Sequence, residues 1–138
     1  MAIDFRINEP ITTDQFVGVL ESSTLGERRP VHDRACMEGM VANASLVVTA
    51  WDGTRLVGVA RSVTDFHYAC YLSDLAVHRD YQRSGIGKRL QALTREQLGP
   101  RCKLILLAAP AASAYYERIG YTHKDRCWVL EPETRTGE

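Results

Sequence analysis

The sequence predicts an α/β (α+β) fold in which helices flank a mixed central sheet. Two observations lead to this prediction. An apolar pattern over 46–63 predicts two antiparallel strands, because an Asp-Gly turn separates them. Further along, an apolar strand at 70–77, a glycine turn with a helix over 85–98 and a strand at 103–107 form a strand–helix–strand unit with parallel strands and a right-handed crossover.

The remaining elements follow from local patterns. Residues Ile3 to Ile7 alternate apolar and polar side chains, as a strand with one buried face does. The segment Thr12-Thr13-Asp14 can cap a helix that extends to Ser22. Further elements are expected as a helix at 31–42, a short helix at 111–119 and a closing strand at 127–130, followed by a polar tail.

The composition is typical of a soluble globular domain and argues against several function classes. Of 138 residues, 45% are hydrophobic and 25% are charged. The 17 basic residues balance 17 acidic ones, so no overall field attracts nucleic acid or an anionic membrane. The four cysteines form no Cys-x-x-Cys pair, and neither a long apolar segment nor a leader-like start is present. We therefore expect a cytoplasmic protein with no metal site, no nucleic-acid partner and no membrane partner.

The most informative segment is the glycine loop Gln82-Arg83-Ser84-Gly85-Ile86-Gly87-Lys88, which follows an apolar strand and opens a helix. A helix N-terminus behind a glycine turn presents free backbone N–H groups and the positive end of the helix dipole, which together bind anions such as pyrophosphate. The spacing does not fit a nucleoside-triphosphate P-loop, because Arg89 takes the place of the magnesium-binding hydroxyl. It does not fit a dinucleotide fingerprint either, because Leu90 replaces the third small residue.

Two motifs resemble those of the GNAT N-acetyltransferases. Gln82, Gly85 and Gly87 fit the acetyl-CoA loop of that family, Gln/Arg-x-x-Gly-x-Gly/Ala. About thirty residues later, Ala114-Tyr115-Tyr116-Glu117-Arg118-Ile119-Gly120-Tyr121 resembles its second signature. The resemblance extends from about Leu46 to Leu130 and implies the GNAT fold, a mixed sheet with a strand–helix–strand acetyl-CoA site. It implies a single domain over 1–138, divided into a strand and acceptor-side helices over 1–44, the sheet and acetyl-CoA site over 45–130, and a tail over 131–138.

The resemblance also implies an activity, an acetyl-CoA-dependent N-acetyltransferase in which a primary amine attacks the acetyl group directly in a ternary complex. The acceptor would be a small-molecule or peptide amine, and a homodimer is compatible with the sequence. Ala109 stands where the family often has an asparagine against the pantetheine arm, and Ser113 is expected to supply a substitute hydrogen bond. By resemblance, the cofactor contacts comprise the end of the strand, the glycine loop and one serine: Leu75, Ala76, Val77, Gln82, Arg83, Ser84, Gly85, Ile86, Gly87, Lys88 and Ser113.

Acetyl transfer to an amine needs a neutral amine, a fixed donor for the oxyanion and a proton for the departing thiolate. Tyr116 is the expected acid by its place in the second signature, since a phenol of pKa about 10 can protonate a thiolate whose conjugate acid has a pKa of about 8.5. The backbone at 75–77 is the expected oxyanion donor, again by resemblance.

The general base is left open between two interpretations. Asp74 is the only carboxylate in its strand, which favours it as a base. Strand alternation places Asp74 on the face opposite Ser73 and Tyr71, and by resemblance the base more often lies on the face of those two residues. In that case Ser73 and Tyr71 line the acceptor site and a chain of water molecules removes the proton. Two histidines, His67 and His78, are weaker candidates and are expected in surface loops.

The acceptor site is expected to draw on Arg29, from a charged loop, and on an aromatic wall made of Phe66, Tyr68 and Tyr71. No residue identifies the amine. Two alternatives to the enzyme stay open. One is a non-catalytic acetyl-CoA-binding regulatory module of the same fold. The other is a tRNA-acetylating toxin of the same fold, against which the neutral net charge argues, because nucleic-acid binding needs several phosphate contacts.

Overall fold

The computed structural model describes residues 2–132, and the chain divides into an N-terminal unit, Met1–Leu106, and a C-terminal unit, Leu107–Glu138. The C-terminal unit holds η3 (Pro110–Ala112) and α4 (Ser113–Arg118). The N-terminal unit contains, in chain order, β1 (Ile3–Ile7), α1 (Thr13–Glu21), η1 (Thr24–Arg28), α2 (Arg34–Ala42), β2 (Leu46–Asp52), β3 (Arg55–Thr64), β4 (Ala69–Val77), η2 (Arg79–Tyr81), α3 (Ile86–Glu96) and β5 (Lys103–Ile105).

The five strands of the N-terminal unit form one mixed sheet in the order β1-β2-β3-β4-β5. The first four strands are antiparallel neighbours, and β5 runs parallel to β4 after the crossover through α3. The turn between β2 and β3 has Gly53 at a φ of 60°, which the Asp-Gly pattern predicts. The predicted α/β class and its strand–helix–strand unit are therefore confirmed.

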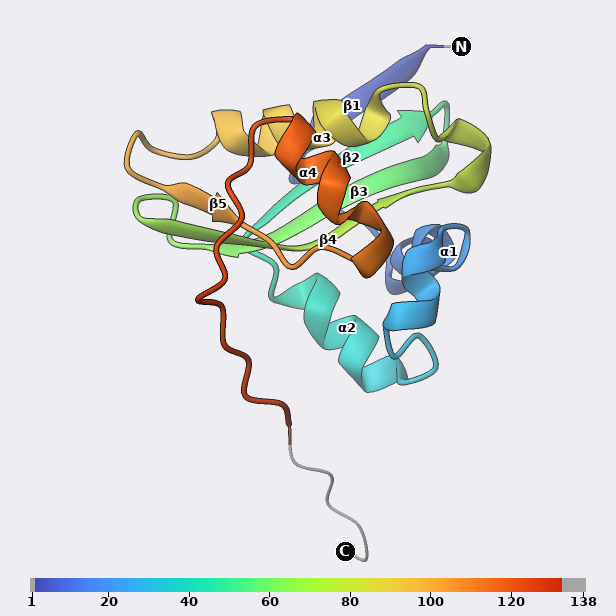
Figure 1. The fold of residues 1–138 in the computed structure, drawn as a ribbon. Helices are drawn as coiled ribbons and strands as arrows, with labels where there is room; N and C mark the ends of the chain where they lie inside the picture. The colour runs from blue at the N-terminus through green and yellow to red at the C-terminus, as the bar shows by residue number, and fades with distance from the viewer. Residues whose placement is uncertain (1, 133–138) are drawn as a thin grey trace, which may run out of the picture. The chain divides into compact units, whose positions relative to one another are not determined.

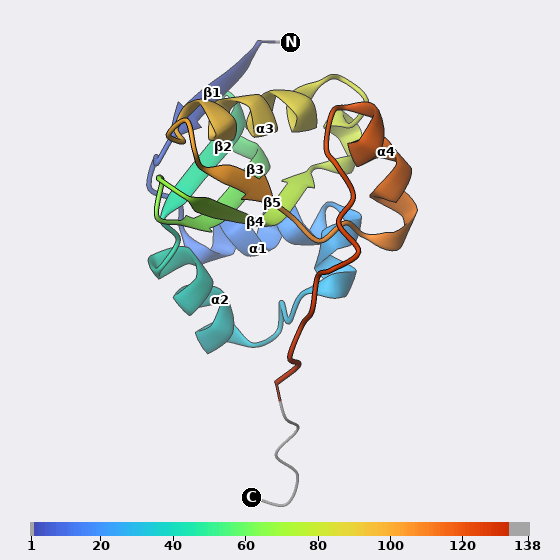
Figure 2. The same ribbon diagram turned by 60° about the vertical axis from the view of Figure 1, so that its left-hand side comes forward.

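Helices cover both faces of this sheet (Figure 1). On one face α3 packs against the sheet and buries Leu90, and on the other face α1 and α2 pack and bury Phe16 and Met37. Figure 2 shows the helices on the two faces of the sheet from a second direction. Each of these large side chains is removed from water completely, and such burial contributes about 1.5–3 kcal/mol per side chain to the free energy of unfolding.

Capping side chains fix where the first two helices begin. Thr12 forms a capping box with Gln15 at the start of α1, and the predicted helix is confirmed there. The second helix begins at Arg34, three residues later than the predicted start at 31, because Asp33 accepts the N–H of Cys36 and acts as the N-cap.

A bulge in β4 changes the register with β3. Arg61 lies opposite Asp74, but the next residue along β3, Ser62, lies opposite Leu72. Ser73 is therefore an extra residue in β4, and the faces of the strand on either side of it no longer follow a simple period of two.

The C-terminal unit differs from the prediction at its end. The helix expected at 111–119 forms as η3 followed by α4. The closing strand expected at 127–130 is wrong, because that segment belongs to no strand among the described residues. A strand needs a partner for its backbone groups, and here Trp128 is 92% exposed and Leu130 is 98% exposed. Positions 133–138 of the expected tail lie outside the described residues. No helix within residues 2–132 is long and apolar enough to cross a bilayer.

Candidate active site

The glycine loop reaches α3 through a backbone of uncommon conformation. Gly85 is the N-cap of α3 with a φ of 84°, and no side chain caps the helix, so the N–H groups of its first turn are open to an anion. A Cβ on Gly85 would meet nothing within 4 Å, so the space in front of the loop is open and the φ is what requires glycine. Arg83 also has a positive φ, 63°, and strain of this kind occurs where a loop is shaped for a ligand.

Basic side chains give this loop a positive field. Arg79, Arg83, Lys88 and Arg89 are all exposed, and the first turn of α3 contains no acidic residue. The helix dipole adds to these charges at the same end of the helix. The electrostatics therefore favour an anionic group in front of the loop.

The C-terminal end of β4 has an open edge. β5 pairs only with residues 69–71, so the rest of β4 has no neighbour on that side among the described strands. On the other side, the N–H of His78 donates to the carbonyl of Val57 on β3 at 2.8 Å. Strand alternation then turns the backbone N–H and C=O groups of Leu75 and Val77 to the open side, and those of Ala76 toward β3.

The open edge adjoins the glycine loop. The Gln82 side-chain amide donates to the carbonyl of Val77 at 2.9 Å. A Cβ built on Gly87 would lie 3.7 Å from Val77 Cγ2. Ser84 is exposed, whereas the side chain of Ile86 is buried in the core beneath α3 and leaves only its backbone for a ligand. The N-terminal unit thus brings together, at 75–77 and 82–88, all the expected cofactor contacts except Ser113.

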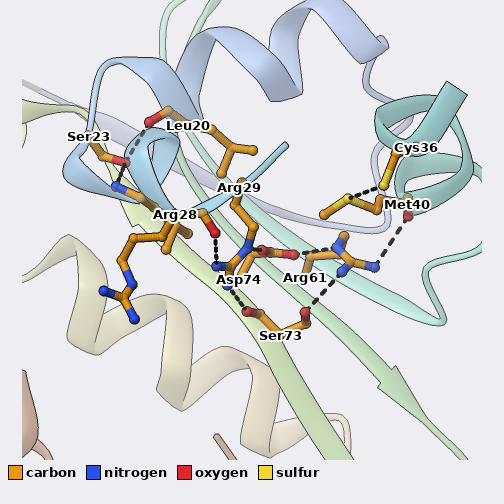
Figure 3. Close-up of polar contacts among 10 residues, drawn as sticks. Leu20, Ser23, Arg28, Arg29, Cys36, Met40, Arg61, Ser73 and Asp74 are labelled. Carbon is orange, nitrogen blue, oxygen red and sulfur yellow. Dashed lines mark hydrogen bonds and ion pairs between the residues drawn. The ribbon is translucent and has the colours of Figure 1, made fainter. Parts of the chain in front are cut away.

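Asp74 lies beside this edge in a clamp of two arginines (Figure 3). Its side chain is fully buried. Arg29 Nε donates to one carboxylate oxygen and Arg61 Nε to the other, each at 2.5 Å. Arg61 also donates to Ser73 Oγ at 3.0 Å and to the Met40 carbonyl at 3.4 Å. The clamp joins β3 and β4 to the segment after η1 and to α2.

The clamp corrects the expected placement of Ser73 and Asp74 and gives Arg29 a structural role in place of the expected contact with the acceptor. Ser73 and Asp74 do not lie on opposite faces, because the bulge lets both reach the Arg61 guanidinium. Arg29, expected at the acceptor, uses its three nitrogens for Asp74, the Arg28 carbonyl and the Ser73 carbonyl. Its side chain is 23% exposed, and its guanidinium fixes the segment after η1 to β4.

The three aromatic residues expected at the acceptor do not form one wall. Phe66 packs against the core beneath α3. Tyr71 lies on the other face, where its cross-strand neighbours are Val63 and Ile105. Tyr68 is exposed and lies under the Lys103 ammonium, 3.7 Å from its ring centre. Only Tyr71 and Tyr68 are therefore available to a ligand from solvent.

The two histidines have different environments. His67 is exposed, as expected. His78 is 7% exposed, so its expected surface position is wrong. It is the N-cap of η2, where its Nδ1 accepts the N–H of Asp80 at 3.1 Å, and its Nε2 lies 2.8 Å from Arg55. Burial and then the nearby Arg55 charge lower the pKa of His78 below 6.5.

Tyr116 lies in the C-terminal unit, on α4, and is partly buried. Its ring meets those of Tyr115 and Tyr121 edge to face, with centroids 5.2 and 5.4 Å apart. Burial, and to a smaller extent Tyr115, raises the pKa of Tyr116 above 10, so its phenol is protonated at neutral pH. Ser113 is exposed at the start of the same helix.

Residues 15–128 match the acetyltransferase (GNAT) domain family, which is most of the chain. This chain belongs to the GNAT family. An uncharacterized ycf52-like N-acetyltransferase of Prochlorococcus marinus is 29% identical over 112 residues, which cover 77% of this GNAT protein and 57% of that relative. The chain spans only about half the length of the curated relatives it matches.

Solved structures of GNAT proteins share the fold. A probable acetyltransferase of unknown function from meticillin-resistant Staphylococcus aureus superposes with a TM-score of 0.78 at 18% identity, covering 96% of this chain and 100% of that one. A ribosomal-protein-alanine N-acetyltransferase from Brucella melitensis gives 0.72 at 20% identity, with the same coverage. At such identities the likeness concerns the fold. The expected GNAT membership and the GNAT-type fold are both confirmed.

One residue of the site in this GNAT protein, Arg61, was not predicted from its sequence. Arg61 completes the clamp on Asp74, although it lies within the apolar run of β3. Charged residues are almost never fully buried unless they are paired. An arginine and an aspartate in the middle of two neighbouring apolar strands were the signal that could have revealed this pair.

Proposed function

We propose that this chain transfers an acetyl group from acetyl-CoA to a primary amine by direct attack in a ternary complex. The family supports acetyl transfer in general, and the open edge of β4 beside the glycine loop carries the finer proposal. The pyrophosphate would bind at the first turn of α3, where backbone N–H groups and basic side chains favour it. The pantetheine arm would run along the open edge of β4.

The reaction would use the backbone of β4 for the charge that develops on the acetyl carbonyl. The N–H groups of Leu75 and Val77 face the open side and are fixed by the pairing of β4 with β3. A fixed donor of this kind needs no reorganisation when the oxyanion forms. Tyr116 would give its proton to the departing thiolate.

Asp74 would position the site and not act as the base. Both of its carboxylate oxygens accept from arginines, and its side chain has no access to solvent. A general base has to come within hydrogen-bond reach of the amine or of a bridging water. Water that enters beside Ser73 and Tyr71 would remove the proton from the amine.

Exchange of Gly85 for alanine tests the cofactor site, and Gly53→Ala is its matched control. Both glycines have a positive φ with open space around the missing Cβ, at 84° and 60°. Both exchanges should cost about 1–2 kcal/mol of stability. Only Gly85→Ala should weaken acetyl-CoA binding, by at least about tenfold in calorimetry, because its methyl group enters the space of the anion.

Equal acetyl-CoA affinity in both variants would contradict the proposed cofactor site. Turnover is tested separately with a broad panel of amines, including small amines and a peptide N-terminus. Tight acetyl-CoA binding that persists without acetylation of any amine would support the regulatory module instead.

A further inference from the structure

A cavity of about 340 Å³ lies on the face of the sheet that α1 and α2 cover. This volume falls at the lower end of the roughly 300–1,000 Å³ range of small-molecule pockets. No residue of β4, of the glycine loop or of α3 lines it, so it is separate from the proposed cofactor site. Its lining comes from the segment between β1 and α1, from α1, from the end of α2 and the residues that follow it, and from the strands β2 and β3: Asn8, Glu9, Pro10, Ile11, Phe16, Val41, Ala44, Ser45, Val47, Val59 and Arg61.

The cavity combines apolar walls with one buried cation. Most of its lining side chains are aliphatic or aromatic, and Arg61 is 8% exposed. Of the five N–H donors of a guanidinium, the three described bonds of Arg61 go to Asp74, to Ser73 Oγ and to the Met40 carbonyl. The bond to Met40 is the longest of these, at 3.4 Å. Arg61 can therefore donate to one more acceptor.

The charges around Arg61 leave room for an anion. Two guanidinium groups share the single carboxylate of Asp74, that of Arg61 with a side chain 9% exposed and that of Arg29 with a side chain 23% exposed, so the cluster has two positive charges and one negative charge. A buried charge is costly unless it is paired. The acidic residue of the lining, Glu9, is exposed and pairs with Arg6 at 3.3 Å, so it does not neutralise the cluster.

We propose that this cavity binds a small monocarboxylate with an apolar body, whose carboxylate accepts from Arg61. The apolar body would fill the space between Phe16, Val47 and Val59. The proposal concerns a second ligand site and does not depend on the acetyl-transfer reaction. Because the same guanidinium holds Asp74 and Ser73, an occupied cavity would act on the bulge of β4 through one side chain.

Titration of the protein with hexanoate, monitored through the NMR signals of the backbone amides of the protein, tests this site. Hexanol and hexylamine are the neutral and cationic controls of the same length. Hexanoate should bind saturably and at least about tenfold more tightly than either control, because only the carboxylate gains a charge-assisted bond to the guanidinium. The amide signals of Ser73 and Asp74 should shift with the same dissociation constant.

A cavity-blocking variant makes the test specific without touching the buried ion pair. Ala44→Phe places a ring at the lining of the cavity, and Ala35→Phe makes the same exchange at an exposed position of α2 that does not line it. Hexanoate binding should be lost in Ala44→Phe and retained in Ala35→Phe. Equal binding of hexanoate and hexanol, no saturable binding of hexanoate, or unchanged binding in Ala44→Phe would each overturn the proposal.

Discussion

Two aspartates of this protein, Asp74 and Asp14, pair with arginines at the same distance but in opposite environments. Arg29 and Arg61 hold Asp74 at 2.5 Å with no exposure of the carboxylate, and Arg34 holds Asp14 at 2.5 Å with the carboxylate 83% exposed. Solvent screens the second pair, whereas removing one partner of a buried pair leaves an uncompensated charge in the interior. The two sites therefore separate the effect of burial from that of distance.

We expect Asp74→Asn to lower the free energy of unfolding by about 3–5 kcal/mol, because the buried Arg61 and the partly exposed Arg29 lose their shared counter-charge. Asp14→Asn should leave the free energy of unfolding nearly unchanged, because its pair is exposed. Urea denaturation measures the free energy of unfolding of both variants. If Asp74→Asn is as stable as the unaltered chain but loses turnover, Asp74 is the general base after all and the positioning role is wrong.

The role of Tyr116 can be tested by removing a single hydroxyl group. Tyr116→Phe removes the phenolic O–H and keeps the ring between Tyr115 and Tyr121. We expect turnover to fall at least about tenfold with acetyl-CoA affinity unchanged, because proton donation contributes about 10²–10⁴-fold to such steps. Tyr115→Phe is the matched control and should keep its turnover. Equal turnover in the two variants would remove the acid role from Tyr116.

At the scale of elements, the unit of β4, the glycine loop and α3 was predictable from the sequence and the bulge within it was not. Apolar runs, glycines and helical spacing are local patterns that residues 70–98 carry themselves. The bulge depends on how β3 pairs with β4, which the sequence of one strand does not contain. For this reason simple strand alternation predicted Ser73 and Asp74 on opposite faces, whereas in the structure both side chains contact Arg61.

His78, which lies between β4 and η2, should make the stability of the fold depend on pH. The lowered pKa of His78 means that the folded state favours the neutral imidazole. Its contribution to stability is therefore fully present above pH 6.5 and is lost as the pH falls below that value toward the folded-state pKa. His78→Asn keeps an acceptor for the Asp80 N–H but does not titrate. Between pH 7.5 and 5.5, we expect thermal unfolding to shift less in this variant than in the unaltered chain, whereas identical shifts would contradict the assignment.

The segment 127–130 shows the other limit of prediction from local patterns. Its Cys-Trp-Val-Leu sequence has the apolar, β-branched and aromatic composition of a strand. Composition does not supply a neighbour, however, and the described structure has no ladder at this segment. The edge strand β5 is likewise shorter than expected: it spans three residues, Lys103–Ile105, whereas the sequence predicts a strand over 103–107.

At the scale of the whole molecule, composition and the order of motifs led from the sequence to the family, and the match over residues 15–128 confirms it. The sequence indicated the proposed cofactor loop, because backbone N–H groups at a helix N-terminus bind an anion closely only where glycines stand at defined positions. It did not locate the clamp or the cavity, because each is assembled from segments far apart in the chain, as Arg29, Arg61 and Asp74 are. The proposed acceptor amine corresponds to no local pattern in the sequence.

Thermal unfolding with acetyl-CoA, with ATP and NAD as controls, tests the central claim most directly. A ligand at 100 times its dissociation constant stabilises the folded state by about 2.7 kcal/mol, which raises the unfolding temperature by several degrees at this chain length. We predict such a rise with acetyl-CoA and none with the two nucleotides. No rise with acetyl-CoA, or a rise only with ATP or NAD, would contradict the assignment of the glycine loop to acetyl-CoA.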